Sequence, residues 1–185
     1  TSNVSASAGT DYTGVSTLTP IKFAPGEVTK TIVVPVIDND FDGDGKADVF
    51  WRNSNGDNVI WLMNGTSFTP LLTNSVSVFN AVAGIGDVNG DGKADVVWRN
   101  AVTGDVVVWL MNGATISSAA TITSVSSVWV LSATGDIDGD GKADLIFENT
   151  STGDVVVWLM NGLTIKQTAL VDRVIHTSWT IVEPR

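Results

Sequence analysis

The chain has 185 residues, with 10 basic and 20 acidic side chains and a formal net charge of −10. Its 43% hydrophobic content is enough for a packed core, whereas a negative charge without a basic run disfavours nucleic-acid binding. The chain has no cysteine, which excludes disulfides and thiol chemistry, and no apolar run long enough to cross a membrane as a helix.

Residues 1–37 carry two strand signals. The strands are expected at about residues 15–23 and 28–37, joined by the turn residues Pro25 and Gly26. Because an isolated hairpin is marginal in water, we expect the second strand to serve as the strand that precedes the first acidic segment.

Three acidic segments follow with one spacing, at residues 40–48, 87–95 and 136–144. We call them the first, second and third loops and number the residues of each from 1 to 9. Each has oxygen-bearing side chains at positions 1, 3, 5 and 9, glycine at position 6 and lysine at position 7. Such side chains point inward when the backbone coils around a hard cation, glycine allows the sharp turn, and position 7 offers its carbonyl oxygen. We therefore predict one calcium ion in each loop, three in all.

The predicted ligands are Asp40, Asp42, Asp44, Asp48 and the Lys46 carbonyl in the first loop, Asp87, Asn89, Asp91, Asp95 and the Lys93 carbonyl in the second, and Asp136, Asp138, Asp140, Asp144 and the Lys142 carbonyl in the third. Carboxylates this close repel one another and raise one another's pKa unless a divalent cation lies among them. More than half of the 20 acidic residues lie in the loops, so the acidity of the chain is mostly metal-site acidity. A solvated acidic turn without an ion is the alternative interpretation.

The loops differ from an EF-hand, which has a bidentate glutamate at position 12 and flanking helices. Here position 12 is Trp51, Trp98 or Phe147, inside β-branched and aromatic runs that predict strands. We therefore expect loops between strands, with calcium dissociation constants at the weak, extracellular end of the range, about 10⁻⁴ to 10⁻³ M.

Four strand signals recur with each loop. One strand follows the loop directly, and the second ends in Asn-Gly, at residues 64–65, 112–113 and 161–162, which favours a two-residue hairpin. A third strand follows the hairpin, and a fourth, around residues 76–85 and 125–133, runs into the next loop. The second strands are apolar at successive positions, which indicates burial on both faces. The predicted fold is all-β, with β-propeller-like blades of four antiparallel strands in three repeats, preceded by a β-hairpin segment.

The repeats resemble FG-GAP or VCBS repeats of integrin-type β-propellers, on the sequences at 86–100 and 104–113. The resemblance covers residues 37–185 and implies a calcium-stabilised propeller used in adhesion, in ligand binding or as an accessory module of exported enzymes. The metal positions of that family fall on the loop residues given above. Such propellers usually close with about seven blades, whereas this chain has three repeats. Residues 8–15 and 22–38 resemble the middle of a Calx-beta domain.

The predicted domains are a truncated Calx-beta-like segment at 1–37 and three repeats within 38–185, at about 40–86, 87–135 and 136–185. Residues 176–182 match the strand that leads into a loop. Three blades are fewer than the usual minimum of four for a closed ring, and open blades expose sheet edges. We therefore expect a homo-oligomer or head-to-tail polymer in which the N-terminal strands complete the sheet of the next subunit. A fragment of a longer exported protein is the alternative.

The expected function is an extracellular, calcium-stabilised structural or adhesion module of a surface fibre, adhesin or matrix. Because millimolar calcium is found outside cells, a secreted or cell-surface location is expected. A lectin-like carbohydrate-binding module is the alternative, with Trp51, Trp98, Arg52 and Arg99 as candidate ligand-binding residues. An enzyme is not expected, because the single histidine, His176, has no recognisable catalytic partner motif.

Overall fold

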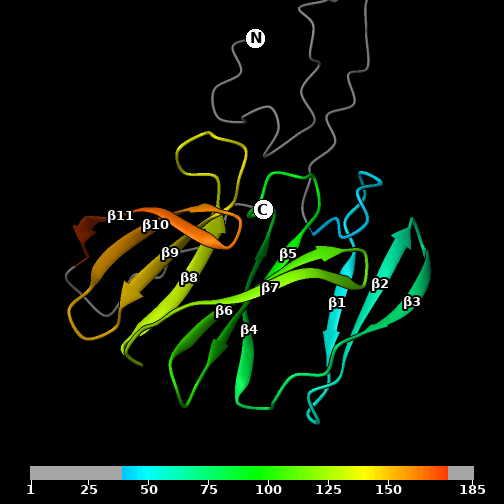
Figure 1. The fold of residues 1–185 in the computed structure, drawn as a ribbon, viewed down its shortest axis with the longest axis horizontal. Coiled ribbons are helices and arrows are strands. Elements are labelled where there is room, and N and C mark those ends of the chain that lie inside the picture. The colour runs from blue at the N-terminus through cyan, green and yellow to red at the C-terminus, as the bar shows by residue number, and fades with distance from the viewer. Residues whose placement is uncertain (1–38, 175–185) are drawn as a thin grey trace, which may run out of the picture.

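A computed structural model of the protein describes residues 39–174, which form eleven β-strands in three antiparallel sheets (Figure 1). This part of the chain has no helix, and therefore none that could cross a bilayer. The strands are β1 (Val49–Arg52), β2 (Asn58–Asn64), β3 (Ser67–Thr73), β4 (Asn80–Gly86), β5 (Asp95–Asn100), β6 (Asp105–Asn112), β7 (Thr115–Ser124), β8 (Trp129–Gly135), β9 (Asp144–Asn149), β10 (Asp154–Asn161) and β11 (Thr164–Arg173). The hairpin expected at 15–37 and the strand expected at 176–182 lie outside the described residues.

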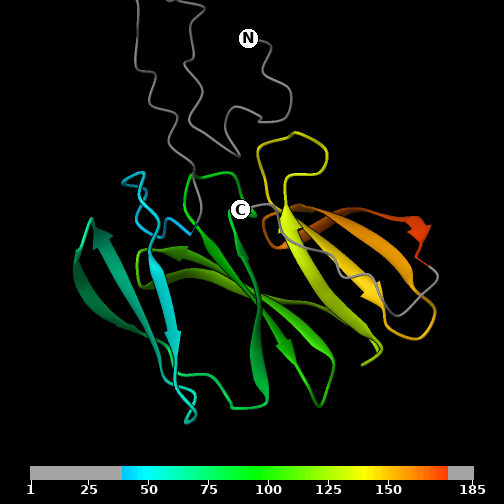
Figure 2. The same ribbon diagram turned by 180° about the vertical axis from the view of Figure 1, so that it is seen from behind.

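The three sheets stand side by side as propeller-like blades, with the second between the other two (Figures 1 and 2). The first sheet has the order β1-β2-β3, the second β4-β5-β6-β7 and the third β8-β9-β10-β11. β4 contacts β8, so the strands that precede two of the loops are neighbours. The predicted all-β, blade-like fold is confirmed. The second and third sheets take in the strands before their loops, β4 and β8, so these two sheets are offset by one strand from repeats counted from the loops.

The hairpin after each second strand differs in detail from the expected Asn-Gly turn. In the first sheet Asn64 pairs with Ser67, so asparagine is the last residue of the strand and the two turn residues are glycine and its successor. Gly65, Gly113 and Gly162 have φ angles of 64°, 61° and 59°, whereas the residues after them do not have positive φ. Glycine alone at the first turn position is the requirement of a type II′ turn, which suits the twist of a hairpin.

The core lies between the sheets. One cluster joins Phe41 and Ile60 of the first sheet and its loop to Trp98 and Met111 of the second. A second cluster joins Val97 and its neighbours on the other face of the second sheet to the third sheet. The second sheet is thus buried on both faces, as the unbroken apolar run of β6 predicted.

Close packing of the inner strands depends on glycine in β4. A Cβ atom added to Gly84 in β4 would lie 2.5 Å from Cγ2 of Thr134 in β8, a distance that real Cβ contacts do not show. Only hydrogen therefore fits at residue 84 without moving the side chains of Thr134 and Leu131.

We predict that Gly84→Ala lowers the free energy of unfolding by about 1–3 kcal/mol, because it overpacks the contact between β4 and β8. Urea unfolding measures the change. Gly135→Ala is the matched control: Gly135 ends β8, its φ is not positive, and no atom lies within 4 Å of an added Cβ. Equal stability of the two variants would contradict the close contact.

Candidate metal centre

The carboxylate at position 1 organises each loop from within. Asp40 accepts hydrogen bonds at Oδ1 from the N–H groups of Gly43, at 2.7 Å, and Asp44, at 3.2 Å, and at Oδ2 from that of Gly45, at 2.7 Å. Asp87 and Asp136 accept the same three bonds in their loops. Because the two glycines of each loop have φ near +80°, the backbone coils around this carboxylate.

Positions 3 and 5 continue the coil on the exposed side. The side-chain oxygen of Asp42 accepts the N–H of Asp44, and that of Asp44 accepts the N–H of Lys46. Asn89 takes the place of the carboxylate in the second loop and makes the same bond to Asp91, at 2.8 Å. All three loops therefore have one backbone conformation, although one of them has an amide at position 3.

Position 9 is a buried carboxylate that joins two strands to the loop. Asp95 is fully buried and accepts hydrogen bonds at Oδ2 from the N–H of Val88, at 3.0 Å, and at Oδ1 from that of Met111 at the end of β6, at 2.8 Å. The two oxygens of Asp48 bond in the same way to Phe41 and Met63, and those of Asp144 to Ile137 and Met160. Each carboxylate thus fastens its loop to the second strand of the hairpin.

Burial makes some of the loop carboxylates costly to ionise. It raises the pKa of Asp95 to about 7, although two backbone N–H groups act against the shift. Burial also raises the pKa values of Asp87 and Asp144. A nearby divalent cation would favour the ionised forms and so remove this cost.

Carboxylate oxygens converge in the first and third loops. One oxygen each of Asp40, Asp42 and Asp48 lie within 4.8 Å of one another, as do those of Asp136, Asp138 and Asp144. Either set could hold a metal ion, and hard oxygen donors suit calcium. The second loop has only two carboxylates at the equivalent positions, because Asn89 replaces the third.

In the described part of the chain, the lysines that pair with loop carboxylates reach those at the exposed positions 3 and 5. Lys166 in β11 has its Nζ atom 3.0 Å from Asp138 and 3.2 Å from Asp140, and Lys46 pairs with Asp44. Among residues 39–174, no salt bridge reaches the carboxylates at positions 1 and 9. The carboxylates at positions 1 and 9 thus have no positive partner from the described side chains, which is the arrangement that a bound cation would complete.

The three loops and the strands between them match a known family of repeats. The model described as FG-GAP-like repeat matches residues 40–98 and again 87–147, together more than half of the chain. The chain belongs to the FG-GAP-like repeat family. No curated protein and no solved structure matches it. Each match begins at position 1 of a loop, so the FG-GAP repeats include the loops described above, whereas nothing in the comparisons concerns the expected Calx-beta likeness of residues 1–37.

The candidate ligand-binding residues of the FG-GAP repeats lie in two environments. Trp98 is 1% exposed in the core between the first two sheets, with the guanidinium of Arg52 5.1 Å from the ring centroid. Arg52 and Arg99 donate hydrogen bonds to backbone carbonyls of the segments between sheets. Trp51 is 48% exposed, so it alone of these four presents a wide aromatic surface.

Sequence reasoning missed the partners of position 9. Its two donors are backbone N–H groups, which no side-chain pattern reveals. A signal nevertheless exists, because aspartate precedes the methionine of each second strand by 15 or 16 residues in every repeat.

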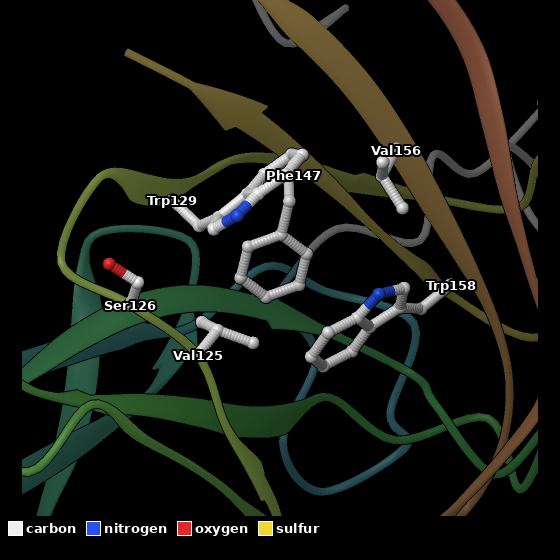
Figure 3. Close-up of a pocket in the computed structure, with 6 residues that line it drawn as sticks. All are labelled: Val125, Ser126, Trp129, Phe147, Val156 and Trp158. Carbon is white, nitrogen blue, oxygen red and sulfur yellow. The ribbon is translucent and has the colours of Figure 1, made fainter. Parts of the chain in front are cut away.

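A cavity of about 220 Å³ lies where the third sheet meets the segment after β7. Figure 3 shows Trp129, Phe147 and Trp158 turned toward one another across it, with Val125 and Val156 at its sides. Phe147 occupies the repeat position that Trp98 fills in the second sheet, and its ring is smaller. The smaller ring leaves more room at this position than tryptophan would.

We predict that Phe147→Trp fills the cavity and raises the free energy of unfolding by about 0.5–2 kcal/mol. The reciprocal variant Trp98→Phe should lose about 1–3 kcal/mol, because it opens a similar space between the first two sheets. Denaturant unfolding of both variants tests the pair. A loss of stability in Phe147→Trp would show that this space cannot accept the larger ring.

We predict that substitutions at positions 5 and 9 of a loop change the free energy of unfolding by different amounts. Asp95→Ala leaves the buried N–H groups of Val88 and Met111 without acceptors, so it should lower stability by about 2–5 kcal/mol even in a chelator. The matched variant Asp91→Ala removes an exposed carboxylate of the same loop, and its metal-free stability should change by less than about 0.5 kcal/mol. Urea unfolding in EGTA gives both values, and similar losses would contradict the structural role of position 9.

Proposed function

We propose that this protein is an extracellular structural or adhesion module whose blades are stabilised by one calcium ion in each loop. The observation that carries the proposal is the convergence of carboxylates from positions 1, 3 and 9 at a point where the loop is already fastened to β1 and β2, or to β9 and β10. A cation at this point would hold together one loop and two strands of one blade.

Calcium suits the donor set better than the alternatives. The loops offer carboxylate, amide and backbone oxygens in a flexible, glycine-containing coil, whereas zinc prefers histidine and cysteine in a tetrahedral site. Magnesium demands a nearly ideal octahedron and dehydrates reluctantly, which a coil with some five oxygen donors does not enforce. The proposed ligands remain those at positions 1, 3, 5 and 9 with the carbonyl at position 7.

The proposed role is structural because the loops lie where neighbouring blades meet. The backbone carbonyl of Asp40 accepts the N–H of Ala94, at 2.6 Å, and that of Asp87 accepts the N–H of Ala143, at 2.6 Å. A loop held in one conformation by an ion would therefore also hold the hydrogen bond to the next blade in place. A switch of the EF-hand kind needs flanking helices that change their angle, whereas β1, β5 and β9 follow these loops and β4 and β8 precede the second and third.

The proposed location follows from the affinity expected of the loops. With no bidentate glutamate at position 12, dissociation constants of about 10⁻⁴ to 10⁻³ M require millimolar calcium for occupancy. Such concentrations are found outside cells, which is also where adhesion modules of the FG-GAP type are typical.

We predict that removal of calcium loosens the fold. At 10 mM calcium, each site with the affinity given above adds about 1.4–2.7 kcal/mol to the free energy of unfolding. Three sites together should raise the melting temperature by about 10 °C or more relative to EGTA. Differential scanning calorimetry measures the shift.

Magnesium at the same concentration is the control for a general effect of divalent charge, and it should raise the melting temperature much less. Equal melting temperatures in calcium and EGTA would contradict a structural role for the ion.

A further inference from the structure

The two contacts between neighbouring blades repeat the same pair of backbone hydrogen bonds. At positions 1 and 2 of the first loop, the carbonyls of Asp40 and Phe41 accept N–H groups of Ala94 and Gly113 in the next blade, at 2.6 and 2.7 Å. The carbonyls of Asp87 and Val88 accept those of Ala143 and Gly162, at 2.6 and 2.8 Å. Each loop is thus an acceptor for the following loop and the following hairpin turn.

The side chain at position 2 enters the core that this contact creates. Phe41 and Val88 are both fully buried. The equivalent residue of the third loop, Ile137, is 52% exposed. Within residues 39–174, no backbone N–H group of another sheet reaches the carbonyls of Asp136 and Ile137. The third blade therefore presents an acceptor face without a described partner.

The first blade presents the matching donor face. Trp98 in the second sheet and Phe147 in the third are each 1% exposed, because the preceding blade covers them, whereas their equivalent Trp51 is 48% exposed. Its ring lies 4.8 Å from that of Trp61, which stacks on Phe68 at 4.0 Å between ring centroids. This aromatic cluster lies on the side of the first sheet that faces away from the second.

The residues that carry the backbone N–H donors of this face are exposed, as Trp51 is. Ala47 is exposed, whereas its equivalent Ala94 is 4% exposed and donates its N–H to the preceding loop. Gly65 is likewise equivalent to Gly113, the second donor, and Gly65 is exposed whereas Gly113 is half-buried. The two donors of a blade contact are therefore available on the first blade.

We infer that a second copy of this chain docks head-to-tail, its first blade covering the acceptor face of the third blade. In this contact Ile137 enters the space beside Trp51 of the second copy, as Phe41 does beside Trp98, and the N–H groups of Ala47 and Gly65 bond to the carbonyls of Asp136 and Ile137. The contact continues the interface already present twice in the chain, and the second copy is the occupant because the two faces complement each other. The inference rests on the proposed structural role and names its partner.

The geometry is heterologous, because different faces of the two copies meet. Such contacts close into a ring when the rotation allows and otherwise continue as a filament. The described sheets of two copies number six, which is within the four to eight that close a propeller. We therefore expect a dimer in which both pairs of faces are engaged.

The experiment uses two variants, each with a charge on one face. Ile137→Asp alters the acceptor face and Trp51→Asp the donor face, and both side chains are exposed, so the fold should be retained. Val102→Asp is the matched control, because Val102 is 70% exposed in a turn of the second blade, away from both faces. Sedimentation velocity of the full chain in calcium, over a range of concentrations, measures assembly, and circular dichroism checks folding. If Trp51→Asp does not fold, Phe68→Asp replaces it.

The wild type and Val102→Asp should assemble, and each face variant alone should dissociate with a constant raised by about 30-fold or more. An equimolar mixture of the two face variants should recover a dimer, because one copy of each retains the face that the other needs. A wild-type monomer at all concentrations would overturn the inference, as would failure of the mixture to recover a dimer. Because every sample contains calcium, these results do not depend on the shift in melting temperature that tests the proposed function.

Discussion

The structure depends on buried carboxylates at the joints between strands. At position 9 of every loop an aspartate fastens the loop to the second strand, and at position 1 another aspartate coils the loop around itself. Burial of these charges is expensive without a positive partner, and among the described side chains lysines reach only the outer positions. This joint also fixes the loop backbone, so that in the first and second loops the carbonyls of positions 1 and 2 accept hydrogen bonds from the next blade.

The same contact between one blade and the next recurs along the chain. Each blade has a face that donates to the preceding loop and a face that accepts from the following hairpin. The middle blade uses both, which buries its second strand on both sides. The outer blades use one each within the described residues, and this asymmetry gives the molecule two different, complementary surfaces.

Much of the fold could be predicted from sequence because the repeat is strict. The spacing of the three loops and the apolar runs of the second strands predicted blades buried on two sides, and the described residues show this for the second sheet, whereas Trp51 and Phe68 leave one face of the first sheet exposed. The type of hairpin was harder to predict, because Asn64 belongs to β2 and the two turn residues are Gly65 and Thr66. The role of Asp95 as a fastener was also hidden, because its partners are backbone groups of Val88 and Met111. The exposure of Trp51 could not be read from its residue type, since its equivalent Trp98 is buried in the same repeat position.

Calorimetric titration of calcium into the chelator-treated chain tests the central claim most directly. Three equivalents should bind, and loss of the position 1 carboxylate from one loop, as in Asp40→Ala, should reduce the number to two. Absence of a binding signal at millimolar calcium, or an unchanged number in the variant, would contradict the assignment of the loops as calcium sites.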